Sequence, residues 1–303
     1  MTWGDLSHNT LVVAVGVAAV GFASGVVGSL CVLRKRALAG DAAAHATLVG
    51  VAGAFLVTGR RDLVTLLVGA VVAACAGLGV LVLVRRLTRT RDDAATAIVI
   101  GVSFGAGIAL ISGLPAWGYP GSAGLEQFLL GHTAALTRHD AMLLAMIAVG
   151  AIAVVAAILK EATLVAFDES FASATGWPVW VIDAIVVGLV AVMVVVGLPA
   201  VGAVLVTALV VIPPVAARLW TDRVGTLVVV SGVIGLVAAV SGVAVSASQS
   251  RLATGPLVVL TASMLFAVSL VIGPRRGVVA RRLAGLQRSD RRGLVDEPGG
   301  HDA

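Results

Sequence analysis

The sequence predicts an all-α protein that crosses a membrane many times, and three observations favour this fold class. The 303 residues are 59% hydrophobic and 12% charged, whereas soluble domains are about 45–50% apolar and about 25% charged. The apolar residues form runs of about 20 residues, which as helices span the roughly 30 Å of membrane hydrocarbon. Alternating segments of about ten residues, which a membrane β-barrel needs, do not occur. We therefore expect a polytopic transmembrane helical bundle.

Nine segments are long and apolar enough to be spans, with eight spans as the alternative. They are 11–33, 42–58, 63–84, 95–114, 141–159, 179–198, 200–218, 225–246 and 256–273. The first ten residues contain no Lys or Arg, so the first segment is expected to be a retained helix and not a signal peptide. Close helix packing is expected where glycines recur four residues apart, as in Gly21–Gly25 and Gly101–Gly105. Cys31 and Cys75 are expected to be small core residues.

Two segments between the spans carry structure of their own. Segment 115–140 begins with Pro115 and Trp117 and is expected to form a short interfacial or re-entrant helix, since aromatic residues favour the membrane boundary. Segment 161–178 is expected to form a short helix that Asp168 caps and that Gly176 with Pro178 ends.

Within the spans, the adjacent prolines Pro213 and Pro214 predict a helix break in 200–218, because proline removes a backbone donor and obstructs the preceding turn.

The distribution of charge predicts the orientation. With the N-terminus outside, 17 of the 21 Lys and Arg residues lie in cytosolic segments and 4 lie outside, as the positive-inside rule requires. The net charge of +5 is therefore attributed to cytosolic loops and not to nucleic-acid binding. Residues 1–284 are expected to form a single membrane domain, and the Arg-, Gly- and Asp-rich residues 285–303 a disordered cytosolic tail.

The sequence contains no motif for bond cleavage or nucleotide hydrolysis. Its only lysines are Lys35 and Lys160, and neither follows a glycine, so the phosphate-binding P-loop is missing. The zinc-protease motif His-Glu-x-x-His is missing too. The pattern Gly-x-Ser-x-Gly occurs at 101–105, but inside an apolar predicted span and not at the strand-to-helix turn of a nucleophile elbow. The chain is therefore not expected to be an enzyme.

The strongest candidate site is the pair Asp41 and His45 in the segment 37–56. Residues four apart on a helix share a face, and ionisable groups in a membrane segment usually line a polar path or pair within the protein. In one interpretation Asp41 caps the helix that follows Gly40 and His45 binds a neighbouring carbonyl. In the other, the pair lines a path for a divalent cation such as Mn, Fe or Zn, which accept carboxylate and imidazole ligands.

Two copies of the chain about a twofold axis would bring together two carboxylates and two imidazoles, enough for a four-ligand site. Polar residues at the outer mouth are candidates to attract or pass on a metal, although surface loops often carry such residues without that role. They are Glu126, His132, His139 and Asp140. Asp183, one turn into its span, is interpreted as a packing or interface carboxylate.

Four stretches together resemble one family. Gly40-Asp41-Ala42-x-x-His45-Ala46 after Val32-Leu33-Arg34 resembles the signature region of the membrane subunits of manganese/zinc/iron-type ABC importers, which are distantly similar to the vitamin B12 and siderophore permeases. Three further stretches match in order, over roughly residues 11–275. They are Phe128-Leu129-Leu130-Gly131; Asp168-x-x-Phe171-Ala172-x-x-x-Gly176; and Val201–Val206 through Ile212-Pro213 to Ala217-Arg218.

The resemblance implies a homodimeric permease with a type II importer fold in the bacterial inner membrane, N-terminus outside and C-terminus in the cytosol. A cytosolic ABC ATPase dimer would drive it, and an extracytoplasmic substrate-binding protein would supply it. Asp168, Phe171, Ala172 and Gly176 would belong to the coupling helix that docks on the ATPase. Asp41 and His45 match the pore ligands of the family, with the metal as transported substrate and no permanently bound cofactor. Ala44 and Val49 stand where the family often has Ser and Pro, which leaves the metal open.

Three functional hypotheses follow. The first is a permease for a divalent transition metal. The second is a permease for a metal chelate of siderophore or cobalamin type, which would need a wide apolar tunnel. The third is a proton-coupled secondary carrier that uses Asp41 and His45 as a relay, against which the ATPase-docking segment 161–178 argues.

Overall fold

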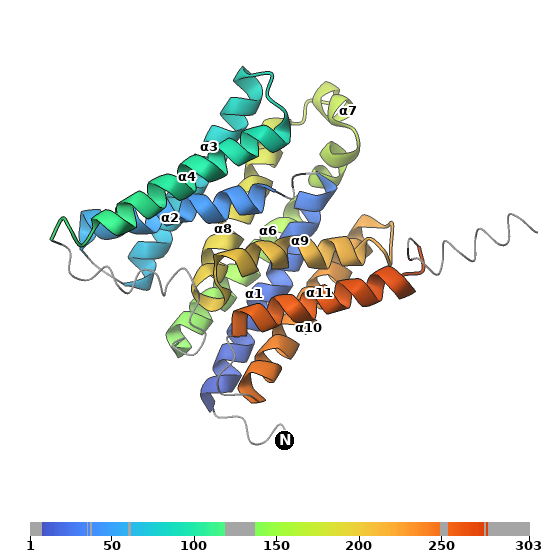
Figure 1. Ribbon diagram of the computed structural model, residues 1–303. Coiled ribbons are helices and arrows are strands. Elements are labelled where there is room, and N and C mark those ends of the chain that lie inside the picture. The colour runs from blue at the N-terminus through green and yellow to red at the C-terminus, as the bar shows by residue number, and fades with distance from the viewer. Residues whose placement is uncertain are drawn as a thin grey trace, which may run out of the picture.

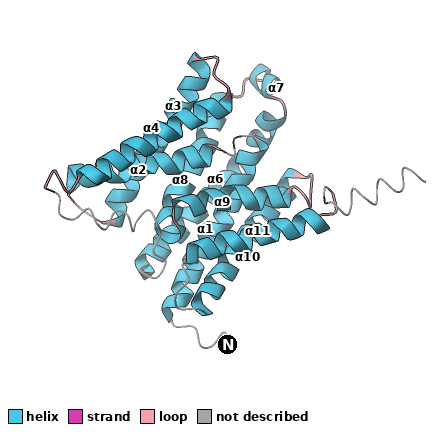
Figure 2. Cartoon of the chain, in the orientation of Figure 1, coloured by secondary structure: helices cyan, strands magenta, loops and turns pink. Residues whose placement is uncertain are grey.

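Ten α-helices make up the regular structure of the described residues, and no strand occurs among them (Figures 1 and 2). The computed structural model describes residues 8–34, 36, 38–59, 62–118, 137–248, 254–275 and 277. The helices are α1 His8–Leu33, α2 Ala39–Thr58, α3 Leu63–Leu87, α4 Asp92–Gly113, α6 Arg138–Phe167, α7 Glu169–Ala174, α8 Val179–Val201, α9 Ala203–Ala217, α10 Val224–Ser248 and α11 Thr254–Ile272. The predicted all-α fold class is confirmed.

Eight of these helices are long and apolar enough to cross a membrane, and the apolar part of α9, Val206–Ala217, is shorter. The nine predicted segments thus correspond to eight full-length helices and one short one. Segment 161–178 differs in detail from its prediction. Its first part continues α6 as far as Phe167, and only Glu169–Ala174 forms the separate short helix α7. Lys160 and Glu161 mark the end of the apolar run without ending the helix, since both are good helix formers.

The predicted break at Pro213 and Pro214 is wrong. Both prolines lie inside α9, and the chain breaks instead at Gly202, where φ is 91°. That angle is open to glycine and rare for other residues. Since Pro214 has no N–H to offer the carbonyl of Val210, that carbonyl is left for a neighbour. The backbone of Gly28 in α1 lies directly against the Val210 oxygen, so that a Cβ at Gly28 would collide with it. Packing by α1 thus accommodates the proline pair.

Helix α1 lies at the centre of one half of the bundle and contacts α6, α8, α9 and α10. Helix α2 contacts α3, α4, α8 and α9, and Figure 1 shows α2, α3 and α4 side by side, away from α10 and α11. Helix α8 contacts α1, α2, α3, α6 and α9, and so joins the two groups.

Of the two predicted glycine pairs, one packs as expected. A Cβ at Gly21 would lie 2.7 Å from the Gly235 oxygen of α10, and one at Gly25 would collide with the Ser231 carbonyl. These glycines let α1 and α10 pack backbone to backbone. Gly101 and Gly105 of α4, in contrast, have open space at the Cβ position, so they mediate no contact with a helix in the described part of the chain.

The arginines that follow α1 and α11 lie at one end of the bundle, whereas Arg138 starts α6 at the other end. Arg34, after α1, binds the end of α6 and the start of α8. The backbone N–H of Arg275, after α11, donates to the Leu219 carbonyl beyond α9. Exposed tryptophans lie at this end too, namely Trp177, Trp180 and Trp220, where aromatic rings suit a membrane interface. We call it the basic end.

Candidate functional site

Helix α2 is built to pack closely on its neighbours. Its alanines at positions 39, 42, 43, 44 and 46 are buried, and small side chains let surrounding helices approach. A Cβ at Gly69 of α3 would lie 2.7 Å from the Gly50 oxygen of α2, and one at Gly77 would lie 2.7 Å from the Ala46 Cβ. Helix α2 is therefore packed closely on α3. The positions of the α2 side chains that do not face α3 are fixed by this packing.

Asp41 and His45 lie on the open face of α2. The Nε2 atom of His45 is 3.6 Å from Oδ1 of Asp41, and the two side chains are 26% and 43% exposed. This distance is too long for a hydrogen bond, but it allows both groups to contact one ion. The imidazole ring meets Phe104 of α4 edge-on, with centroids 5.4 Å apart and planes at 87°, which restricts its orientation.

The helix-capping interpretation of Asp41 is not supported. Helix α2 begins at Ala39, its N-cap is Leu38 without a side-chain capping bond, and Asp41 lies within the first turn. The helix dipole still favours a negative charge at this position. Among the described residues, His45 is the one polar contact of the Asp41 carboxylate. Both groups thus remain available to a ligand.

The open face extends along the helix beyond the pair. Val49 is half-buried, and a Cβ placed on Gly53 would have no atom within 4 Å. Together with Asp41 and His45, these residues recur every four positions, and residues four apart lie on the same face of a helix. No group of three or more His, Cys, Asp or Glu side chains able to hold a metal occurs among the described residues of one chain. In the part of one chain that the structure describes, the pair therefore offers one carboxylate and one imidazole with no third ligand of this kind beside them.

The four outer candidates do not gather around a site in the described residues. Glu126 and His132 lie outside the part of the chain that the structure describes, as does the stretch 128–131. His139 is exposed in the first turn of α6. Asp140 forms a capping box with Thr137: its Oδ2 accepts from the Thr137 backbone N–H at 3.0 Å, and the Thr137 hydroxyl accepts from the Asp140 N–H at 3.2 Å. The Asp140 carboxylate therefore serves the start of α6.

Helix α7 has the cap and the end that its sequence predicts. The Asp168 carboxylate accepts from the Phe171 N–H at 2.9 Å, and Gly176 adopts a φ of 84° just after the helix. Ala172 is fully buried and anchors α7, whereas Phe171 is 55% exposed and the preceding Phe167 is 73% exposed. Figure 1 shows α7 at the periphery of the bundle. Helix α7 thus presents one exposed aromatic side chain, Phe171, and α6 ends just before it on another, Phe167.

The structure also reveals a cluster of charged residues that sequence reasoning did not assemble. Arg34 and Arg36 both bind the carboxylate of Asp183 in the first turns of α8. Arg34 also approaches Glu169 of α7 at 3.9 Å. A carboxylate within an apolar span signals that a partner exists. However, Arg34 and Arg36 are 149 and 147 residues away in sequence, so only the fold identifies them.

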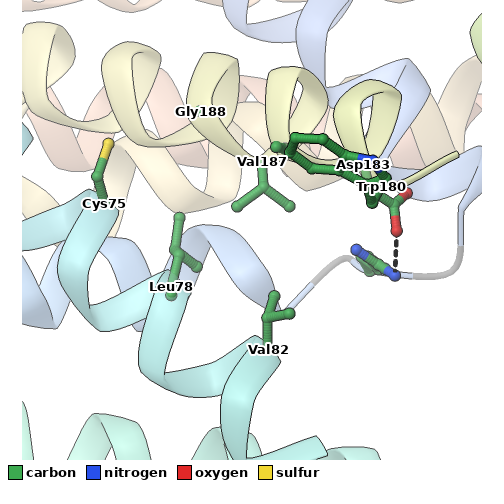
Figure 3. A pocket seen from close by; sticks show the side chains of 10 residues that line it. Cys75, Leu78, Val82, Trp180, Asp183, Val187 and Gly188 are labelled. Carbon is green, nitrogen blue, oxygen red and sulfur yellow. Dashed lines mark hydrogen bonds and ion pairs between the residues drawn. The ribbon is translucent and has the colours of Figure 1, made fainter. Parts of the chain in front are cut away.

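A groove of about 370 Å³ opens beside this cluster, between α3 and α8. Figure 3 shows Cys75, Leu78 and Val82 of α3 facing Val187 and Gly188 of α8 across it, with Asp183 at one end. The groove is lined mainly by apolar side chains and ends at the ion pair between Arg36 and Asp183.

Taken together, the membrane-spanning bundle, the ionisable pair on an open helix face and the aromatic short helix at the basic end define a membrane transport protein. The chain belongs to the ABC 3 transport family, whose family model matches residues 7–273.

Two membrane proteins of metal transport systems are similar to this chain over nearly its whole length. The chain is 39% identical over 296 residues to the manganese transport system membrane protein MntC of Bacillus subtilis (strain 168), covering 97% of this chain and 68% of the relative. It is 38% identical over 287 residues to the zinc transport system membrane protein TroC of Treponema pallidum (strain Nichols), covering 95% of each. A chain of the solved structure of PsaBC from Streptococcus pneumoniae in complex with Fab superimposes with a TM-score of 0.78 at 26% identity, covering 89% of this chain and 94% of that one.

Proposed function

We propose that this chain is the membrane permease subunit of a bacterial inner-membrane ABC importer that carries a divalent transition-metal ion, manganese, zinc or iron. The observation that carries the proposal is the pairing of Asp41 with His45 at 3.6 Å on an otherwise apolar, open helix face. The names of the relatives, a manganese and a zinc transport protein, support the substrate class. One carboxylate and one imidazole suit each of these metals.

The site is proposed to be completed by a second copy of the chain. Two α2 helices about a twofold axis would offer two carboxylates and two imidazoles to one ion. The tight packing of α2 on α3 supports this arrangement, because it holds the ligands in place. A transported ion must also leave its site, so coordination by few protein groups is suited to transport.

Two further partners belong to the proposal. A separate cytosolic ATPase dimer would dock on α7, whose exposed Phe171 offers an apolar contact and whose buried Ala172 fixes the helix to the bundle. An extracytoplasmic binding protein would deliver the metal at the opposite end, where the N-terminus lies outside. The basic end then faces the cytosol, as the positive-inside rule requires.

The test is metal uptake by the assembled transporter. The chain, its ATPase and its binding protein are reconstituted in vesicles, and uptake of radioactive Mn²⁺ and Zn²⁺ is measured for the wild type, Asp41→Ala and His45→Ala. Both variants are expected to lose uptake and to retain the ATPase during purification, because neither side chain belongs to α7, the proposed docking helix. Gly101→Ala on the open face of α4 is the matched control and should transport normally.

Unchanged uptake in both variants would remove the site assignment. Uptake of a metal chelate in place of the free ion would select the chelate hypothesis. Metal uptake that continues without ATP but follows an imposed proton gradient would select the secondary carrier.

A further inference from the structure

The geometry points to Arg34, Arg36 and Asp183 as positioning residues that link α7 mechanically to the start of α2, where Asp41 lies. This inference rests on the proposed function, in which α7 receives the movement of the ATPase. The three residues form a charged cluster at the basic end, and none of them is a proposed metal ligand. We refer to them as the corner cluster.

Arg34 connects three elements through one guanidinium group. Its Nη1 donates to the Val165 carbonyl near the end of α6 at 2.6 Å and lies 3.9 Å from the Glu169 carboxylate of α7. Its Nη2 binds Asp183 of α8. The Arg34 side chain is 7% exposed and Asp183 is 18% exposed, so their ion pair is largely shielded from water and from salt, whereas Glu169 is 67% exposed. The planar guanidinium fixes the direction of each bond, which an ammonium group would not do.

Arg36 joins the same carboxylate to the turn that leads into α2. Its Nη2 donates to Oδ2 of Asp183 at 2.7 Å. Its own backbone N–H donates to the Cys31 carbonyl at 2.9 Å, and its carbonyl accepts from the Ala39 N–H at 3.0 Å. The turn between α1 and α2 is therefore braced, and Asp41 follows Arg36 by five residues. A displacement of Asp183 is transmitted through this turn to the first turn of α2.

The groove between α3 and α8 lies beside the corner cluster and separates the two helices there. Leu78 and Val82 of α3 are separated from Val187 and Gly188 of α8 by the open groove (Figure 3). Apolar packing between α3 and α8 is therefore incomplete beside the cluster, and the pair of Arg36 with Asp183 bridges its end. The charged contacts thus give α8 a direct link to the α1–α2 turn, in addition to the packing of α8 on α1 and α2.

The experiment measures coupling in the complete transporter reconstituted in vesicles. Metal ions transported per ATP hydrolysed are compared for the wild type, Asp183→Asn, Arg36→Gln and the conservative variant Arg34→Lys. Glu161→Gln is the matched control, because it neutralises a carboxylate near the same end whose buried Oε2 has no hydrogen-bond partner among the described residues.

We expect Asp183→Asn and Arg36→Gln to lower the number of ions per ATP about tenfold, a typical size for coupling between two sites. Basal ATP hydrolysis and co-purification with the ATPase should stay at the wild-type level, since α7 itself is unchanged. Arg34→Lys should give a smaller loss, because it keeps the charge but loses the two-pronged contact. Glu161→Gln should couple normally.

Coupling by Asp183→Asn and Arg36→Gln equal to that of Glu161→Gln would overturn the inference, as would transport and ATP hydrolysis that fall in proportion. If Asp183→Asn does not assemble, Arg34→Lys decides, since it retains the charge balance of the cluster. The proposed function is checked separately by the wild type. A wild type without ATP-driven metal uptake refutes both proposals, whereas normal wild-type uptake with fully coupled variants refutes the corner cluster alone.

A steric variant gives an independent test. Gly188 lines the groove and a Cβ there meets no atom within 4 Å, so the side chain of Gly188→Leu starts in open space. If the groove narrows as α8 moves, this variant should hydrolyse ATP and transport little. Gly150→Leu on α6, also at an open position, is its control, and equal transport by the two variants would contradict a moving groove.

Discussion

Several aspartates lie near helix starts, and a comparison of four of them identifies Asp41 as unusual. Asp62 accepts from the Thr65 N–H at 3.0 Å, Asp168 accepts from the Phe171 N–H at 2.9 Å, and Asp140 completes a capping box. Asp41 makes no such bond in the first turn of α2. The sequence predicted the cap of α7 but left the role of Asp41 open, because Gly40-Asp41 resembles a helix start. The structure places that start two residues earlier.

This contrast predicts opposite effects of two substitutions. Asp140→Ala removes the bond back to Thr137 and should lower the free energy of unfolding by about 1 kcal/mol, while metal uptake stays normal. Asp41→Ala removes no capping bond and should abolish uptake with little change in stability. Thermal unfolding in detergent and uptake in vesicles measure the two effects. Lost uptake with unchanged stability in Asp140→Ala would make that residue a candidate metal contact again.

At the scale of elements, helix ends were harder to foresee than helices. Hydropathy marks the stretch that fits the membrane, not the point where hydrogen bonding stops, so α6 continues past Lys160 to Phe167. The break before α9 falls at Gly202, since glycine alone readily adopts its positive φ, while α1 packs against the carbonyl that Pro214 leaves free. Such neighbours are fixed by the fold, and local sequence does not report them.

Glycine packing leads to a prediction at this scale. Gly21→Ala adds a Cβ 2.7 Å from both the Ala239 Cβ and the Gly235 oxygen of α10, so α1 and α10 must separate. We expect a loss of about 1–3 kcal/mol in stability, as for overpacked cores.

Gly101→Ala meets no neighbour and should be neutral or stabilising by up to about 1 kcal/mol through helix propensity. Thermal unfolding of the two variants distinguishes the sites. Equal destabilisation would mean that Gly101 packs against another helix, such as one in a second copy.

At the scale of the whole molecule, composition and periodicity were sufficient for the fold class, the spans and the open face with Asp41 and His45. The corner cluster was not foreseen, because nothing local to Asp183 selects Arg34 as its partner. The predicted orientation, with the N-terminus outside, stays a prediction. The predicted tail 285–303 lies outside the described residues.

The side of the membrane that the basic end faces is itself testable. With Cys31 and Cys75 replaced by Ser, single cysteines are placed at His139, at the opposite end of α6, and at Ser170 in α7. A membrane-impermeant thiol reagent applied to intact cells should label His139→Cys at once and Ser170→Cys only after lysis. The reverse pattern would invert the orientation and with it the docking of an ATPase on α7.

The central claim is that Asp41 and His45 from two copies hold the transported ion. Electron paramagnetic resonance of Mn²⁺ bound to the reconstituted transporter tests this claim most directly, because imidazole nitrogen bound to the metal leaves a hyperfine signature. We predict nitrogen coupling in the wild type, its loss in His45→Ala, and weaker binding in Asp41→Ala. An identical nitrogen-coupled spectrum in the wild type and His45→Ala would contradict the account.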